Sequence, residues 1–128
     1  MSYLLLIVEP VGQRAQRTPE EGRDAYAQMV RYAEGLKARG LLTQAESLKS
    51  ESEGVRLQIR DGERSLVDGP YAEAKEMIGG FFLLTCDTRE EALALAAECP
   101  AAQWATVEVR ELGPVSYTHL TLPTSDLV

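Results

Sequence analysis

The sequence predicts an α+β fold, a ferredoxin-like split β-α-β domain with an inserted hairpin. A continuous apolar run at Tyr3–Val8 indicates a central strand near the N-terminus. Two helix starts, at Thr18 and Thr88, each lie between segments with the pattern of strands. The predicted order is therefore strand, helix, strand, hairpin, strand, helix, strand. At 128 residues, this order fits a single domain with one core.

The first strand and the first helix carry the clearest local signals. The apolar run Tyr3–Val8 predicts a strand covered on both faces, or covered on one face by a partner subunit. Thr18 is the expected N-cap of the helix, Pro19 its first residue, and Glu21 completes a capping box. The helix is expected to reach about Arg39. Its apolar face repeats at helical spacing through Ala25, Met29, Tyr32, Ala33 and Leu36.

The segment between that strand and helix has two interpretations. Gln13–Arg17 contains two arginines and is expected to be a solvated loop, or alternatively a lid over the sheet that meets an anion. Tyr26, on the helix that follows, is expected in the core or at an interface rather than against a ligand.

The middle of the chain predicts a strand and then a hairpin. A second strand is expected to begin at Leu41 and run through Leu48. Residues Val55–Arg60 alternate apolar and polar side chains, the pattern of a half-exposed strand. Asp61-Gly62 is a hairpin-turn signal, so Arg64–Val67 is expected to pair with Val55–Arg60.

The C-terminal part predicts a strand, a helix and a last strand. Gly80–Thr85 is expected to be a buried strand. Thr88 is the expected N-cap of the second helix, with Glu91 completing a capping box. The last strand is expected over Trp104–Glu111, and Trp104 is expected to be a packing or dimer anchor. The buried face of the second helix is predicted to include Ala92, Leu95, Ala96 and Cys99.

The segment 68–82 holds the densest group of functional-type residues. It opens with an Asp-Gly-Pro turn and ends with a Gly-Gly pair, where another backbone or a ligand is able to come close. We expect a rigid corner that presents charged side chains at the mouth of the sheet, or else a solvated turn without function. The candidate ligand-binding residues of this segment are Asp68, Tyr71, Glu73, Lys75 and Glu76.

The motif Asp-Gly-Pro-Tyr-Ala-Glu-Ala-Lys-Glu-x-x-Gly-Gly-Phe-Phe resembles the signature of the DGPF family, within the YCII-related superfamily. The family usually has Thr where this chain has Ala74, and the resemblance covers nearly all of residues 1–114. It implies a homodimer whose sheets pack face to face as a dimeric α+β barrel, and a genomic association with sigma factors of the extracytoplasmic-function class. It also makes Glu46 a candidate ligand-binding residue, the alternative being an outward-facing strand carboxylate.

Composition excludes several classes of partner. The formal net charge of −7 would repel a phosphate backbone, so we expect no direct contact with nucleic acid. No apolar run has the length of a membrane helix, and no basic segment precedes Tyr3–Val8 as in a signal peptide. Cys86 and Cys99 are expected to be reduced, buried thiols. A cytoplasmic protein is the resulting expectation.

The chain divides into residues 1–114 and residues 115–128. The second segment resembles the translation of a sequencing adaptor, and we expect it to be an artefactual, disordered tail. It contains His119, the one histidine of the chain. The domain therefore has no histidine for acid–base catalysis, for a nucleophilic triad or for a metal site. We expect no metal and no cofactor, and we favour a protein that is not an enzyme while the enzymatic alternative stays open.

Three functional hypotheses remain open. The first is a small-molecule-binding or regulatory module with its cleft at the motif. The second is a dimeric-barrel enzyme of isomerase or lyase type, in which Lys75 anchors a small anionic substrate and Glu73 is the base. The third is a structural dimerisation module without a ligand.

Overall fold

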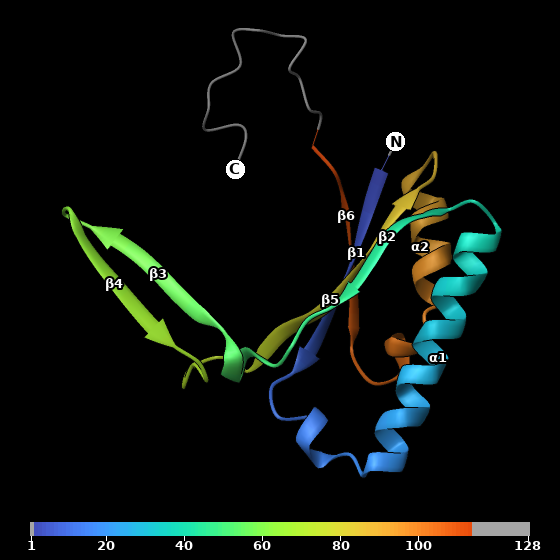
Figure 1. Ribbon diagram of the computed structural model, residues 1–128. Coiled ribbons are helices and arrows are strands. Elements are labelled where there is room, and N and C mark those ends of the chain that lie inside the picture. The colour runs from blue at the N-terminus through green and yellow to red at the C-terminus, as the bar shows by residue number, and fades with distance from the viewer. Residues whose placement is uncertain (1, 114–128) are drawn as a thin grey trace, which may run out of the picture.

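The computed structural model describes residues 2–113 and contains two helices packed on one side of a sheet (Figure 1). The helices are α1 (Pro19–Ala38) and α2 (Arg89–Ala97), and three short 3-10 helices are η1 (Arg14–Gln16), η2 (Glu51–Glu53) and η3 (Pro100–Gln103). The strands are β1 (Ser2–Pro10), β2 (Leu42–Ser47), β3 (Val55–Arg60), β4 (Glu63–Asp68), β5 (Glu76–Thr85) and β6 (Thr106–Glu111).

The main sheet has the strand order β2-β5-β1-β6, and the neighbouring strands are antiparallel. Two β-α-β units, β1-α1-β2 and β5-α2-β6, interleave so that β5 lies between β1 and β2. This is the ferredoxin-like split β-α-β arrangement, so the predicted fold class is confirmed. The predicted hairpin is also present, as the separate two-stranded sheet β3-β4.

Helix α1 begins as its capping residues predict. The Thr18 side chain accepts a hydrogen bond from the Glu21 backbone, and the Glu21 carboxylate accepts one from the Thr18 backbone at 2.8 Å. These two bonds satisfy donors that a helix start otherwise leaves unpaired. The bond from the Thr18 backbone also lowers the pKa of Glu21. At α2 only half of the predicted box forms, in which Thr88 accepts from the Glu91 backbone.

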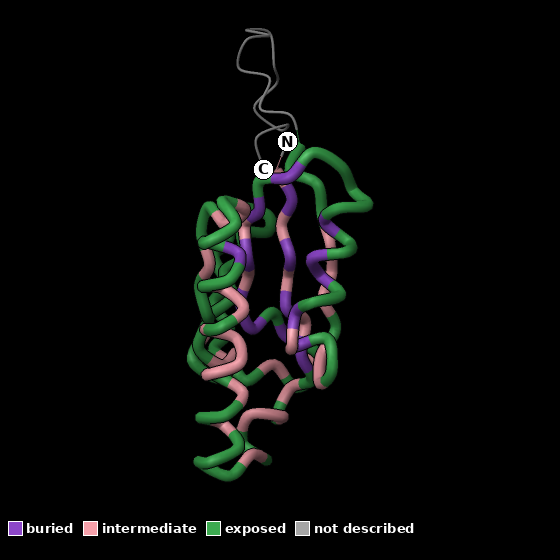
Figure 2. Tube along the Cα trace, turned by 90° about the vertical axis from the view of Figure 1, so that its right-hand side faces the viewer, coloured by how far each residue is buried: buried purple, intermediate pink, exposed green. Residues whose placement is uncertain are grey.

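The core lies between the sheet and the helices, and burial alternates along the central strands (Figure 2). Leu5 and Leu84 are fully buried on the helix-covered face, and Leu36 of α1 packs with them. The Tyr32 ring meets the Phe82 ring edge to face, with centroids 5.2 Å apart. Side chains at the intervening strand positions point to the opposite face, which no described element covers. They are Leu4, Leu6, Val8, Phe81 and Leu83.

Three sequence expectations differ from the structure. Strand β5 begins at Glu76 rather than Gly80, so the Gly-Gly pair lies inside the strand. The hairpin is exposed on both faces rather than half-exposed, because it packs on neither the sheet nor the helices. The last strand begins at Thr106, since η3 and its C-cap Trp104 precede it. The expectation for residues 115–128 lies outside the described residues.

Both cysteines, Cys86 and Cys99, are free and buried, as predicted. Burial raises the pKa of each thiol, which disfavours the reactive thiolate. Neither helix of the described chain has the length and apolar character to cross a membrane.

Replacing Tyr32 with Phe is expected to destabilise the domain by about 0.5–1.5 kcal/mol, because the Leu95 carbonyl would lose one of its two donors and keep the Glu98 amide at 3.2 Å. The Tyr32 hydroxyl donates to that carbonyl at 2.6 Å. Urea unfolding measures the change, and Tyr26→Phe is the control because that ring is 69% exposed. Equal losses in the two variants would contradict this role.

The destabilisation should also depend on pH. Burial raises the pKa of Tyr32 above its ordinary value of 10.0, so the unfolded chain releases this proton at a lower pH than the folded one. The stability that the hydroxyl contributes is complete below pH 10.0 and falls as the pH rises above it. The difference in unfolding free energy between wild type and Tyr32→Phe should therefore shrink above that pH.

Candidate functional site

A cleft of about 650 Å³ lies between α1 and the main sheet. That size is within the range of small-molecule sites. Helix α1 supplies one wall through Tyr26 and Met29, and strands β1, β2 and β5 supply the floor. The lining includes charged side chains and the one tryptophan: Glu9, Arg14, Arg17, Glu46 and Trp104.

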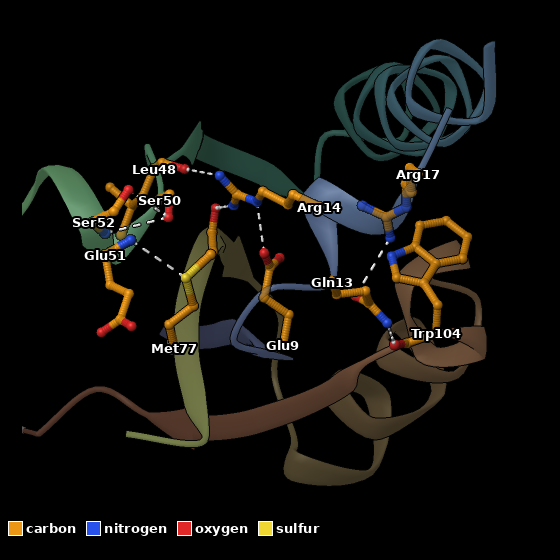
Figure 3. A network of polar contacts seen from close by, with 11 residues as sticks. Glu9, Gln13, Arg14, Arg17, Leu48, Ser50, Glu51, Ser52, Met77 and Trp104 are labelled. Atoms are coloured by element: carbon orange, nitrogen blue, oxygen red, sulfur yellow. Dashed lines mark hydrogen bonds and ion pairs between the residues drawn. The ribbon is translucent and has the colours of Figure 1, made fainter. Parts of the chain in front are cut away.

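Two of these lining residues, Glu9 and Arg14, form an ion pair (Figure 3). Glu9 follows Tyr3, Leu5 and Ile7 at alternate positions of β1, so its carboxylate falls on the buried face and is only 6% exposed. The Arg14 Nε donates to Glu9 Oε1 at 2.6 Å. Burial of a carboxylate requires such a partner, since an unpaired buried charge is costly.

Arg14 also connects two further segments to the end of β1. Its Nη1 donates to the Leu48 carbonyl after β2 at 2.7 Å, and its Nη2 donates to the Gly79 carbonyl of β5 at 3.1 Å. The guanidinium thereby uses its planar fork of donors on three acceptors at once. Within residues 2–113, no donor bonds to Glu9 Oε2, so one oxygen of the buried carboxylate remains available.

Gly79 makes room for this ion pair. Ile7 pairs with Gly80 and Val8 pairs with Ile78, so Gly79 is the extra residue of a bulge in β5. A methyl group at Gly79 would collide with the Glu9 carboxylate and the Arg14 guanidinium. At Gly80 it would lie 2.7 Å from the Glu46 carbonyl oxygen of β2. The predicted close approaches therefore occur, one to side chains and one to backbone.

Aromatic and cationic groups flank the ion pair. The Arg17 guanidinium lies over the Trp104 ring, 5.6 Å from its centroid, which is cation–π geometry. The Gln13 Nε2 donates to the Trp104 carbonyl at 2.7 Å and holds the loop against η3. The segment Gln13–Arg17 is therefore packed over the end of the sheet, closer to the predicted lid than to a solvated loop.

The six residues predicted from the sequence are not brought together. Glu46 borders the cleft, and its exposed carboxylate accepts from Gln44 at 3.4 Å. Glu76 borders a second cleft of about 630 Å³, at the base of the hairpin. Asp68, Tyr71, Glu73 and Lys75 line neither cleft, and no ion pair joins the acidic and basic ones within residues 2–113.

The motif instead supports the base of the hairpin. The Arg56 guanidinium lies 3.7 Å from the centroid of the Tyr71 ring, and the Gly69 amide donates to the Gly54 carbonyl at 2.9 Å. A Cβ at Gly69 would collide with the Glu51 carbonyl oxygen. Lys75 contributes its carbonyl, which accepts from the Val11 amide at 2.9 Å. These contacts give the motif a structural role.

The second cleft contains a polar atom without a partner. Glu51 Oε1 is buried and has no hydrogen bond within the part of the chain that the structure describes. Its other oxygen accepts from the Tyr71 amide at 3.4 Å. In that same part of the chain, no cluster of three or more His, Cys, Asp or Glu side chains is placed to hold a metal ion.

The sequence matches the family model of the YCII-related domain over residues 1–116. The chain belongs to the YCII-related family. An uncharacterized protein, R00369, from Rhizobium meliloti (strain 1021) is 35% identical over 92 residues, which are 70% of this chain and 71% of that protein. This supports the same family membership.

A solved structure shares the fold of this YCII-related domain. It is 5-chloro-2-hydroxyhydroquinone dehydrochlorinase (TftG) from Burkholderia phenoliruptrix AC1100, in complex with 2,5-dihydroxybenzoquinone. The TM-score is 0.52 with 16% sequence identity, and the match covers 91% of this chain and 98% of TftG. At that identity the similarity establishes the fold of the domain and not its chemistry.

Glu9 was not among the predicted site residues, although its signal is in the sequence. Glu9 continues the alternation of Tyr3, Leu5 and Ile7, which places a carboxylate on the buried face of the strand. A charge at a predicted buried position needs a partner, and Arg14 is the next basic residue along the chain. No local sequence pattern indicates the cleft itself, because residues of β1, β5, α1 and η3, which are far apart along the chain, form it together.

Replacing Gly79 with Ala is expected to separate Glu9 from Arg14 and to destabilise the domain by about 1–3 kcal/mol, because the methyl group needs the space of the ion pair. Gly35→Ala is the matched control, since nothing lies within 4 Å of a Cβ there. On an exposed helix position that change should stabilise by about 0.5–1 kcal/mol. Denaturant unfolding measures both, and a neutral Gly79→Ala would contradict the packing described.

Proposed function

We propose that this YCII-related domain binds a small organic molecule in the cleft between α1 and the sheet. The observation that carries the proposal is the buried Glu9 carboxylate, which has one oxygen held by Arg14 and the other without a donor from residues 2–113. An acceptor of this kind at the end of an apolar-walled cleft fixes the orientation of a ligand hydroxyl or amine.

The rest of the cleft supports a planar ligand with some negative charge. Tyr26 and Met29 offer apolar surface, and Trp104 offers a ring beside the Arg17 guanidinium. The Arg17 side chain makes one hydrogen bond in the described chain, from Nη2 to Gln13 Oε1 at 3.4 Å, so most of the guanidinium donors are available to an anionic group. Phenols and aromatic carboxylates combine these features.

Enzymatic turnover is the second candidate function, with Glu9 as the base in place of the predicted Glu73. The oxygen without a donor is the atom that would take a proton from a bound substrate. The fold shared with a dehydrochlorinase supports this candidate by analogy alone. The suggested association with sigma factors stays a prediction from the family resemblance.

Thermal shift with phenols, aromatic carboxylates and 2,5-dihydroxybenzoquinone tests the binding proposal. A ligand at about 100 times its dissociation constant should stabilise the protein by about 2.7 kcal/mol. The shift should be lost in Glu9→Gln, measured against that variant without ligand, and kept in Lys75→Ala. Loss in Lys75→Ala with retention in Glu9→Gln would move the site to the motif. No shift with any compound would favour a structural module.

We also propose that two copies pack their uncovered sheet faces together, as the family resemblance implies. The two central strands give that face an apolar centre, since Leu4 pairs with Leu83 and Leu6 pairs with Phe81. Polar residues of the edge strands flank this centre: Gln44 and Glu46 on β2, and Glu108 and Arg110 on β6. A large apolar patch of this kind usually marks an interface. A C2 dimer would cover the face of each subunit with the other.

Replacing Leu6 with Glu should give a folded monomer, because the new carboxylate would be buried without a partner in the dimer and hydrated in the single chain. Leu93→Glu is the matched control, as this leucine lies on α2 and is 43% exposed. Sedimentation equilibrium at micromolar concentrations separates the two states. A monomeric wild type would contradict the dimer.

A further inference from the structure

The hairpin β3-β4 stands away from the sheet as an arm, on the side opposite the helices (Figure 1). One face of this arm is mostly apolar, because directly paired residues share a face and Leu57 pairs with Leu66. Two charged residues lie on the same face, Arg64 opposite Ile59 and Asp68 opposite Val55. We call the four apolar side chains of this face the arm face. They are exposed by 51–60% and comprise Val55, Leu57, Ile59 and Leu66.

The opposite side of the arm differs in character. Apart from Val67, its side chains are polar or charged, because Arg56, Gln58 and Arg60 alternate with the apolar residues of β3. The contacts of this side are at the base, where Arg56 stacks on Tyr71. The arm is thus fixed at its base with its apolar face left in solvent.

An isolated two-stranded hairpin is at best marginally stable in water. The arm pairs its strands with each other, and beyond its base the described chain offers it no packing surface. Leaving four large apolar side chains exposed on one face also favours association. Both considerations indicate that the arm face is covered in the assembled protein.

A second copy of this chain is the partner that the arm fits best. The arm and the uncovered sheet face lie on the same side of the molecule, so one subunit seated there would contact both (Figure 1). The arm is also electrically neutral, with three arginines (56, 60 and 64) against three acidic residues (61, 63 and 68). A neutral arm approaches another chain of net charge −7 without added repulsion, and it offers no excess positive charge to a polyanion.

We propose that the β3-β4 arm clasps the second subunit, with the arm face Val55, Leu57, Ile59 and Leu66 buried against it. This inference rests on the dimer proposed above and adds a contact that face-to-face packing of the sheets does not require. In a C2 dimer each subunit gives an arm and receives one, so every contact of the arm occurs twice. The Asp-Gly-Pro-Tyr motif, which holds the base of the arm, then sets the direction in which the arm reaches.

Two neighbouring substitutions on the full chain test the arm. Leu66 and Val67 are adjacent and are 55% and 52% exposed, yet they lie on opposite faces of the arm. Leu66→Ser should raise the dimer dissociation constant by about tenfold or more, because two buried leucines are lost per dimer. Val67→Ser should leave it within about threefold of the wild type. Sedimentation over a dilution series measures all three proteins.

Hydrogen exchange tests the contact of the arm in the wild type, without any substitution that could misfold it. In the wild type, amides of β3 and β4 should be better protected above the dissociation constant than below it. Equal protection at both concentrations would overturn the proposal. A wild-type dimer whose dissociation constant is unchanged by Leu66→Ser would overturn the arm and leave the dimer standing. A wild type that is monomeric throughout the series would overturn both.

Discussion

The ion pair between Glu9 and Arg14 is the contact on which the chain around the C-terminal end of β1 depends. It joins the end of β1 to η1, and through the other nitrogens of Arg14 it joins both to β5 and to the segment after β2. Without Arg14, the buried Glu9 carboxylate and two backbone carbonyls would lose donors together. The cleft exists because this group of contacts keeps the chain after β1 folded over the sheet.

Local signals predicted the elements well wherever the local sequence alone decides the outcome. The capping residues of α1 and the turn of the hairpin act over a few positions, and both formed as expected. The start of β5 was predicted four residues late, because glycines ordinarily mark the end of a strand. In the structure the glycines are needed inside β5, where the Glu9–Arg14 pair and β2 come close.

The candidate site was harder to predict than the fold. The site was predicted at the motif because the charged residues of the motif are adjacent in sequence. In the structure most of these residues are exposed around the base of the arm. The cleft gathers Glu9, Tyr26, Gly79 and Trp104, which are far apart along the chain. Only the strand register, including the bulge at Gly79, brings them together, and a one-residue bulge has no reliable signal in a single sequence.

The two adjacent glycines of β5 impose different constraints on how the chain is able to vary. Gly79 faces the ends of two side chains, so a larger residue there is compatible with the fold if shorter residues replace both Glu9 and Arg14. Gly80 faces the main chain of β2, which no substitution elsewhere removes. Positions 9, 14 and 79 therefore form one unit of coordinated sequence change, while position 80 is fixed by the backbone alone. A homologue that has lost both the acid at position 9 and the arginine at position 14 should no longer need glycine at position 79.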